Sequence, residues 1–196
     1  MKLSLCIAVS LGTMLCMVPL AASKTVEYDV VIYGATPGGI AAAIPIARRD
    51  GGARIALVTP YKRVGGMITN GLCHPDFRTF EALTGLFREL NMGVLAHYSA
   101  KYGPDSRQVK DSLQGTHAGP EVNHTVLRQL LEAHENIHIV TEHRLTSVET
   151  RAEKILSAVF NGAGGAVTMT AGHFVDGTYE GDLMAAAGVP YHVGRE

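Results

Sequence analysis

The sequence has few cysteines and no strong charge of either sign. Two of its three cysteines, Cys6 and Cys16, lie near the N-terminus, which leaves only Cys73 in the rest of the chain. One cysteine cannot form a disulfide within that part. The 17 basic and 18 acidic residues give a formal charge of −1, and no basic run occurs. Nothing therefore indicates a nucleic-acid partner.

Several catalytic and metal-binding patterns are missing. The chain contains no G-x-S-x-G nucleophile elbow and no P-loop, so a hydrolase or a kinase has no support. His134, His138 and His143 lie close together in the sequence. A predicted helix gives way to a strand between them, so they would not share one face. Because metal ligands must converge on one point, we expect no metal site.

One long apolar run is present, at the N-terminus. Met1-Lys2 is a short positive start, Leu3–Leu20 is almost wholly apolar, and small residues follow up to Ser23. This pattern predicts a signal peptide over residues 1–23, cleaved near Ala22/Ser23, and a secreted or periplasmic protein. An uncleaved membrane anchor is the alternative, since the run is nearly long enough to span a bilayer. After cleavage we expect no stable membrane association.

The remaining residues, 24–196, have the pattern of one α/β domain. Val26–Tyr33 is an apolar, β-rich run typical of a buried parallel strand. Pro37–Arg49 predicts a helix that kinks or loosens at Pro45, and Ala53–Thr59 predicts a second strand. Strand, helix and strand within such a short span form a right-handed βαβ unit.

Further elements are expected downstream. The apolar spacing predicts helices over Phe80–Leu90, Val122–Ala133 and Glu180–Ala187, and strands over Ile137–Thr141, Leu145–Glu149 and His173–Asp176. Ile155–Phe160 and Ala166–Thr170 flank a glycine-rich turn and predict a hairpin. Lys62–Arg78 is predicted to be a long functional loop, and Gly93–Gly119 a loop or insertion. The fold class is thus α/β, with a parallel sheet, flanking helices and a small β-hairpin.

The turn after the first predicted strand suggests dinucleotide binding. Gly34 and Gly39 match the first and last glycines of G-x-G-x-x-G, and Thr36 replaces the middle one. These glycines allow a tight bend and close packing of helix on strand, and the helix N-terminus attracts phosphate. We expect Gly34, Thr36, Pro37, Gly38 and Gly39 to hold a pyrophosphate, with the Thr36 hydroxyl free to donate to it. A glycine-rich turn without a ligand is the alternative.

The identity of the dinucleotide stays open at this point. An acid usually follows the second strand and binds the ribose hydroxyls, but Thr59 stands there. Lys62 and Arg63 follow closely and favour a site for the 2′-phosphate of NADP as the alternative.

Three phrases, found in order, carry a family resemblance: YDVVIYGATPGGIAAAI (28–44), VTPYKRVGGMITNGL (58–72) and HFVDGTYEGDLMAAAGVPYHVGRE (173–196). Together they resemble the FAD-dependent oxidoreductase family with a glutathione-reductase-like FAD domain. The resemblance implies a Rossmann-like FAD-binding domain, FAD as the cofactor, and hydride or electron transfer on a small-molecule substrate. It also implies a longer protein, of which this chain is the N-terminal portion. A catalytically inert fragment is a further alternative.

The resemblance also assigns residues to the cofactor. Besides the glycine turn, it places Gly65, Gly66 and Met67 near the flavin. Thr59, where the family usually has an acid, is expected by the adenosine ribose, and Arg63 is also expected to bind the cofactor. Gly181 and Asp182 belong to a segment that returns to the cofactor. A double glycine permits close backbone approach to a ring or a phosphate. Asp182 would accept from ribityl hydroxyls, or act as a helix N-cap.

Polar residues that follow Gly65, Gly66 and Met67 are candidates for a catalytic or flavin-anchoring role. His74 would transfer protons or anchor the flavin covalently, and Cys73 is a second candidate anchor. Arg78 would neutralise charge on reduced flavin or hold a substrate carboxylate. Ordinary hydrogen bonds in a polar loop are the alternative for all three. Asn123-His124-Thr125 forms a glycosylation sequon.

Overall fold

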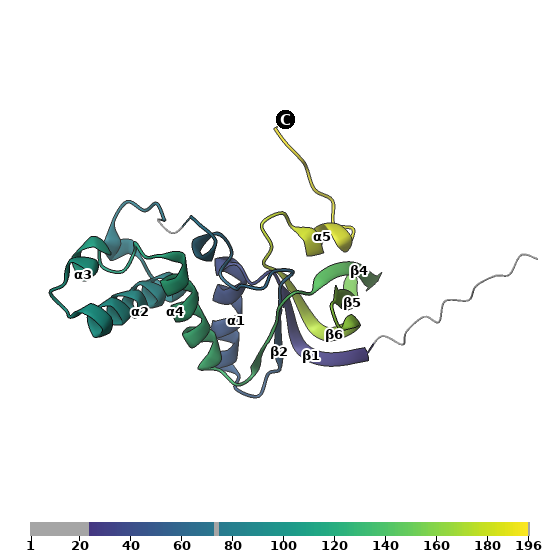
Figure 1. The fold of residues 1–196 in the computed structure, drawn as a ribbon. Coiled ribbons are helices and arrows are strands. Elements are labelled where there is room, and N and C mark those ends of the chain that lie inside the picture. Colours follow the sequence, from purple (N-terminus) through teal and green to yellow (C-terminus); the bar gives the residue numbers. More distant parts are fainter. Residues whose placement is uncertain (1–23, 73–74, 196) are drawn as a thin grey trace, which may run out of the picture.

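The computed structural model describes residues 24–72 and 75–195. They form one six-stranded sheet, in the order β3-β2-β1-β6-β5-β4 (Figure 1). β1, β2, β3 and β6 run parallel, whereas β5 and β4 run antiparallel to their neighbours. The strands are Lys24–Tyr33 (β1), Ile55–Val58 (β2), Ile137–Val140 (β3), Arg144–Arg151 (β4), Lys154–Gly162 (β5) and Gly165–Asp176 (β6). The predicted α/β class, with a parallel sheet and a small meander, is confirmed.

The helices lie on both sides of the sheet (Figure 1). α1 (Pro37–Arg49) lies next to the parallel strands, with α4 (Pro120–Glu132), α2 (Gly85–Tyr102) and α3 (Arg107–Asp111) beyond it. α5 (Asp182–Ala186) lies on the meander side. Two short 3-10 helices, Gly66–Thr69 and Phe80–Ala82, interrupt the long connection between β2 and α2. None of the helices in these ranges is both long and apolar enough to cross a bilayer.

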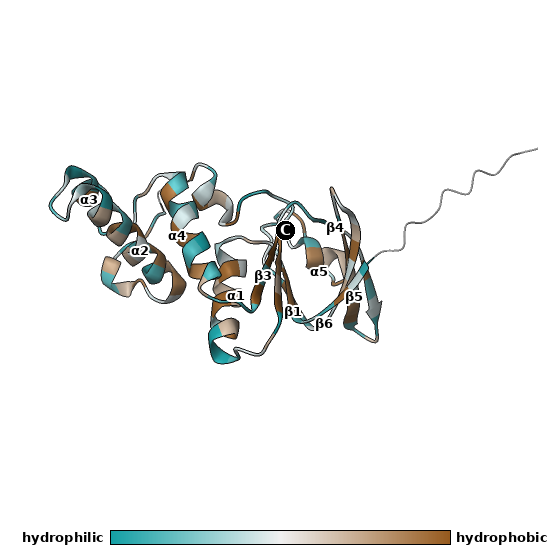
Figure 2. Cartoon of the chain, turned by 60° about the horizontal axis from the view of Figure 1, so that its bottom comes forward, coloured by the Kyte–Doolittle hydropathy of each residue, from teal (hydrophilic) through white to brown (hydrophobic). Residues whose placement is uncertain are grey.

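β1 contributes to two apolar cores, one on each face of the sheet. Val30 and Ile32 pack in the core under α1 and α4, whereas Val31 and Tyr33 pack with Phe160 on the opposite face. Side chains alternate between faces along a strand, so Val30–Tyr33, the part of β1 that is covered on both faces, is apolar at every position. The brown strands in the centre of Figure 2 show this continuous apolar character.

The helical region after the predicted loop Lys62–Arg78 differs from the prediction. We expected a helix over Phe80–Leu90 and a loop from Gly93, but α2 begins at Gly85 and continues through Gly93 to Tyr102. A Cβ atom on Gly93 would lie 2.4 Å from Cγ1 of Val126 on α4. The glycine therefore allows close packing of two helices and does not end one.

α1 is one continuous helix from Pro37 to Arg49, as predicted, and Pro45 lies on its exposed side. The prediction of two separate strands near the end of the chain was wrong. The segments Ala166–Thr170 and His173–Asp176 form one continuous strand, β6, because both halves pair in register with β1.

Candidate dinucleotide-binding site

The candidate site lies where three parallel strands end at the same edge of the sheet. Tyr33, the last residue of β1, pairs with Val58 of β2 on one side and Asp176 of β6 on the other. The next residues continue this register, because Gly34 N donates to Val58 O (2.7 Å) and Gly177 N donates to Tyr33 O (2.7 Å). Ligands of open α/β sheets bind outside such carboxyl ends.

Three glycines form a tight junction at this edge, where β1, α1 and β6 meet. Gly34 has φ +105°, a conformation that favours glycine, and a Cβ atom on it would lie 2.4 Å from the carbonyl carbon of Gly177. A Cβ atom on Gly39 would lie 1.9 Å from Gly34 O. The sequence predicts the steric roles of Gly34 and Gly39 but misses Gly177, whose partners are distant along the chain.

Thr36 caps α1 and also binds the end of β6. Its Oγ1 accepts from Gly39 N (3.3 Å) and donates to Gly177 O (2.6 Å). A hydroxyl has one proton to donate, and Thr36 donates it within the chain. In this structure the hydroxyl therefore connects the glycine turn to the residue after β6. Pro37 is the first helical residue, and the next residue, Gly38, is exposed at the helix N-terminus.

A cavity of about 150 Å³ opens beside this junction. Residues from all three phrases line it, together with Arg144 at the start of β4. The lining residues are Gly34, Ala35, Thr36, Thr59, Pro60, Tyr61, Arg63, Gly66, Arg144, Thr178, Tyr179, Glu180 and Asp182. The fold thus brings together six of the residues predicted to bind a cofactor, although the most distant are 148 positions apart in the sequence.

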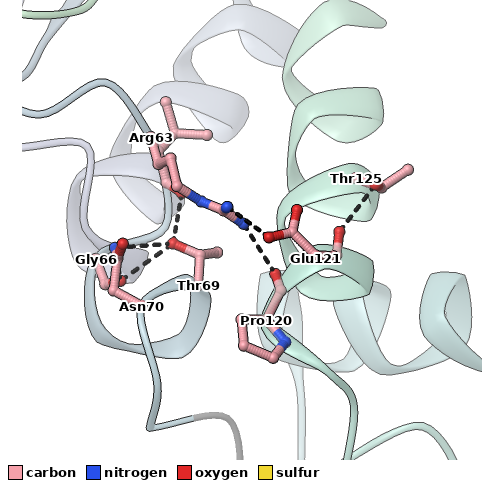
Figure 3. A network of polar contacts seen from close by, with 8 residues as sticks. Arg63, Gly66, Thr69, Asn70, Pro120, Glu121 and Thr125 are labelled. Atoms are coloured by element: carbon pink, nitrogen blue, oxygen red, sulfur yellow. Dashed lines mark hydrogen bonds and ion pairs between the residues drawn. The ribbon is translucent and has the colours of Figure 1, made fainter.

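Thr59, predicted to lie by the adenosine, and Arg63, predicted to bind the cofactor, both have partners within the chain. Thr59 is buried, and its Oγ1 accepts from Tyr61 N (3.3 Å). Arg63 pairs with Glu121 at the start of α4 (2.7 Å; Figure 3), and its hydrogen bond holds the pKa of that carboxyl below the usual range. The Nε atom of Arg63 is buried and has no hydrogen-bond partner in the described chain. Burial of an N–H donor without an acceptor lowers the stability of the folded chain.

The double glycine begins a short turn that is hydrogen-bonded to the first and the third phrase. Gly65 N donates to Ala35 O (2.7 Å), and Met67 N donates to the Tyr179 hydroxyl (2.8 Å). A Cβ atom on Gly66 would lie 2.2 Å from that hydroxyl. The side chains of Tyr61, Met67, Leu72 and Tyr179 are exposed and, with Gly66 and Asn70, line a second cavity of about 400 Å³.

The third phrase is organised by a residue that the sequence does not single out. The N-cap of α5 is Gly181, with φ +73°, and Asp182 is the first helical residue, so the suggestion that Asp182 is the cap is wrong. Asp176 supports this turn instead. It accepts from Thr178 N (2.9 Å), from Thr178 Oγ1 (2.6 Å) and from Met184 N (2.8 Å). An acid at the last position of a predicted strand is the one sequence signal for this role.

Replacing Asp176 by asparagine should loosen this turn. The amide group presents a donor where the carboxylate accepted on both oxygens, so at least one partly buried N–H or O–H loses its acceptor. We expect the free energy of unfolding to fall by about 1–3 kcal/mol. The exposed Asp182→Asn change should stay within about 0.5 kcal/mol. Urea denaturation of both variants measures the difference, and equal midpoints would contradict this role of Asp176.

Other sequence candidates fall outside the two cavities or outside the described residues. His74 and Cys73 lie in the segment that is not described, and Arg78 is exposed and lines neither cavity. Asn123 of the sequon is buried and donates from Nδ2 to Ile68 O (3.1 Å). The folded chain therefore does not present it for glycosylation. Across residues 24–72 and 75–195, no three potential metal ligands converge.

Family comparison decides the identity of the domain. The FAD dependent oxidoreductase family matches residues 29–196. The chain belongs to this family. The resemblance found in the three phrases is therefore confirmed, and FAD is the cofactor that the family implies. No curated protein matches the chain.

Solved structures of a reductase and a monooxygenase have a similar fold. E. coli quinol fumarate reductase FrdA has a TM-score of 0.50 and 17% identity, over 79% of this chain and 33% of its own. Pseudomonas putida p-nitrophenol 4-monooxygenase PnpA has a TM-score of 0.50 and 16% identity, over 86% and 45%. L-proline dehydrogenase from P. horikoshii has a TM-score of 0.44 and 18% identity, over 79% and 23%. The chain thus spans less than half the length of each.

The site has features that fit FAD. The N-terminus of α1, with the exposed Gly38, offers a backbone N–H group and the positive end of the helix dipole to a pyrophosphate. Arg63 Nε is a buried donor beside the same cavity, and it lacks an acceptor in the described chain. The second cavity has the exposed apolar and aromatic lining that suits a flat ring.

Proposed function

We propose that this chain is the FAD-binding part of an exported oxidoreductase acting on a small-molecule substrate. The observation that supports this most directly is the convergence of the three family phrases on one cavity, beside the N-terminus of α1. Bound FAD supplies hydride or electron transfer, while a protein supplies binding, orientation and electrostatics.

The residues divide the binding of FAD between the two cavities. Gly38 and Gly39 at the N-terminus of α1 would take the pyrophosphate, and Thr59 and Arg63 would lie by the adenosine. Gly66 borders both cavities, whereas Met67 borders only the apolar second one. Both residues would face the flavin. Asp182, exposed at the edge of the first cavity, would accept from hydroxyl groups of the cofactor. His74 and Arg78 remain candidates for proton transfer and for binding of an anionic substrate.

Substitution of Arg63 distinguishes FAD from NADP. In an NADP site the guanidinium would bind the 2′-phosphate, and Arg63→Gln should weaken NADP binding at least about tenfold. In an FAD site we expect the same change to alter FAD affinity by less than about threefold, because no phosphate lies there. Glu121→Gln is the matched control, since it breaks the same ion pair and keeps the arginine. Calorimetric titration of both variants with both dinucleotides decides between the cofactors.

Export is proposed from the apolar N-terminal run alone. If the protein is produced in a bacterial host with a periplasm, the mature form should begin near Ser23 or Lys24. N-terminal sequencing of the protein from the periplasmic fraction measures this. A mature protein that retains Met1 in the membrane fraction would favour the uncleaved anchor.

A further inference from the structure

We infer that Thr36 is a positioning residue for the cofactor, and that restoring the glycine it replaces weakens FAD binding. The inference rests on the proposed FAD-binding function. The supporting observation is a pair of hydrogen bonds made by one hydroxyl. It accepts from Gly39 N within α1 and donates to Gly177 O, directly after β6. The second bond joins residues 141 positions apart.

The Thr36 hydroxyl completes the hydrogen bonding of Gly177. The N–H of Gly177 donates to Tyr33 O (2.7 Å), and its carbonyl accepts from Thr36 (2.6 Å). Both polar groups of this peptide segment are therefore fixed against β1 and the glycine turn. Gly177 has no side chain that would restrict it otherwise, so these two bonds set its orientation. The adjoining residues Thr178, Tyr179 and Glu180 line the first cavity.

The same hydroxyl fixes the first turn of α1. Thr36 is the N-cap, with extended backbone (φ −77°, ψ 173°), and its oxygen accepts from the third helical residue, Gly39. Two of the first three helical residues are glycines, which lose more conformational freedom on ordering than other residues. A side-chain cap therefore matters more here than in a helix with larger residues at its start.

Replacing Thr36 by glycine would complete the G-x-G-x-x-G pattern but remove both hydrogen bonds. Gly39 N and Gly177 O would lose their partner, and three of four consecutive residues would be glycines. A bound pyrophosphate would then have to order both turns, and ordering on binding lowers affinity. We expect the dissociation constant for FAD to rise about tenfold, the size of effect typical for loss of a cap or a hydrogen bond. The G-x-G-x-x-G pattern taken alone predicts the opposite, that Thr36→Gly lowers the dissociation constant for FAD.

The test compares Thr36→Gly, Thr36→Val and Thr36→Ser with the unaltered chain. Valine keeps the shape and removes the hydroxyl, whereas serine keeps the hydroxyl and removes the methyl group. Thr125→Val is the matched control, because Thr125 also donates from its hydroxyl to a backbone carbonyl, Glu121 O (2.9 Å), on an exposed face of α4. FAD affinity is measured by calorimetry, and the ³¹P NMR spectrum of bound FAD reports the environment of the pyrophosphate. Thermal unfolding without FAD is recorded for each protein.

The expected result is weaker FAD binding and changed ³¹P shifts for the glycine and valine variants, with the serine variant and Thr125→Val close to the unaltered chain. Equal or tighter binding by a folded Thr36→Gly variant would overturn the positioning role while leaving FAD binding intact. If the glycine variant does not fold, an unchanged affinity and ³¹P spectrum for Thr36→Val would overturn it. A folded, unaltered chain that binds no FAD would overturn the proposed function, and the role of Thr36 with it.

Discussion

Gly39→Ala is expected to prevent the folding of the nucleotide-binding edge and to abolish FAD binding. The added Cβ atom would lie 1.9 Å from Gly34 O and 3.1 Å from the Gly34 carbonyl carbon. Both are backbone atoms, and Gly34 N is itself bonded to Val58 O (2.7 Å), so the turn cannot yield without breaking the register of the sheet. Overpacking of a well-packed core costs about 1–3 kcal/mol, and more where the backbone must shift. We expect a loss of about 3 kcal/mol or more in the free energy of unfolding.

The neighbouring glycine provides the control for this prediction. A Cβ atom on Gly38 would have only one neighbour, Thr36 Oγ1, at 3.6 Å. Gly38 is exposed and helical, and alanine is favoured over glycine in helices by about 0.5–1 kcal/mol. Gly38→Ala should therefore unfold at the same temperature as the unaltered chain or slightly higher. Thermal unfolding of the two variants measures the contrast, and similar melting temperatures for both would contradict the proposed glycine junction.

The second large effect is expected at Gly177, on the opposite side of the same junction. In Gly177→Ala the new Cβ atom would lie 2.7 Å from Gly34 O and 2.8 Å from the Cα atom of Gly39. The change would push α1 away from the end of β6 and break the Thr36 hydrogen bond. We expect the free energy of unfolding to fall by about 2–3 kcal/mol. FAD affinity should fall more than for any variant at Thr36, because both turns would move apart.

Gly172, on β6 shortly before Gly177, serves as the matched control. A Cβ atom there would meet only Asp29 O, at an ordinary contact distance of 3.6 Å. Alanine in a strand interior is favoured over glycine by about 0.5–1 kcal/mol, so Gly172→Ala should be neutral or slightly stabilising. Urea denaturation and FAD titration of the two variants give the comparison. If Gly177→Ala behaved like Gly172→Ala, the end of β6 would not pack against the glycine turn as described.

The sequence predicts those parts of the fold whose causes are local. The apolar run of β1, the glycine turn and α1 follow each other within one short stretch, and their geometry is as expected. The α4 helix is predicted because its buried residues, Val126, Leu127 and Leu131, recur at helical spacing. The β5–β6 hairpin is predicted from its glycine-rich turn. In each case the decisive contacts lie within a few residues of each other.

The parts that the sequence does not predict depend on contacts between distant residues. Gly93 was predicted to begin a loop, because its packing against Val126 of α4 cannot be seen in the sequence. Thr36 reads as a ligand for phosphate until Gly177 O is placed beside it. Arg63 reads as a free cation until Glu121 is seen to pair with it (Figure 3). The sequence predicts Asp176 only as the end of a strand, whereas the structure shows that its carboxylate supports the following turn.

The central claim is that the edge of the sheet beside α1 binds FAD. The most direct measurement is a calorimetric titration of the purified chain with FAD and, separately, with NADP, supported by the fluorescence of bound flavin and by circular dichroism. We predict saturable binding of FAD to a folded protein and no response to NADP. Binding of NADP alone would contradict the assignment of the cofactor. A folded protein that binds neither dinucleotide would contradict the claim that this edge of the sheet is a cofactor site.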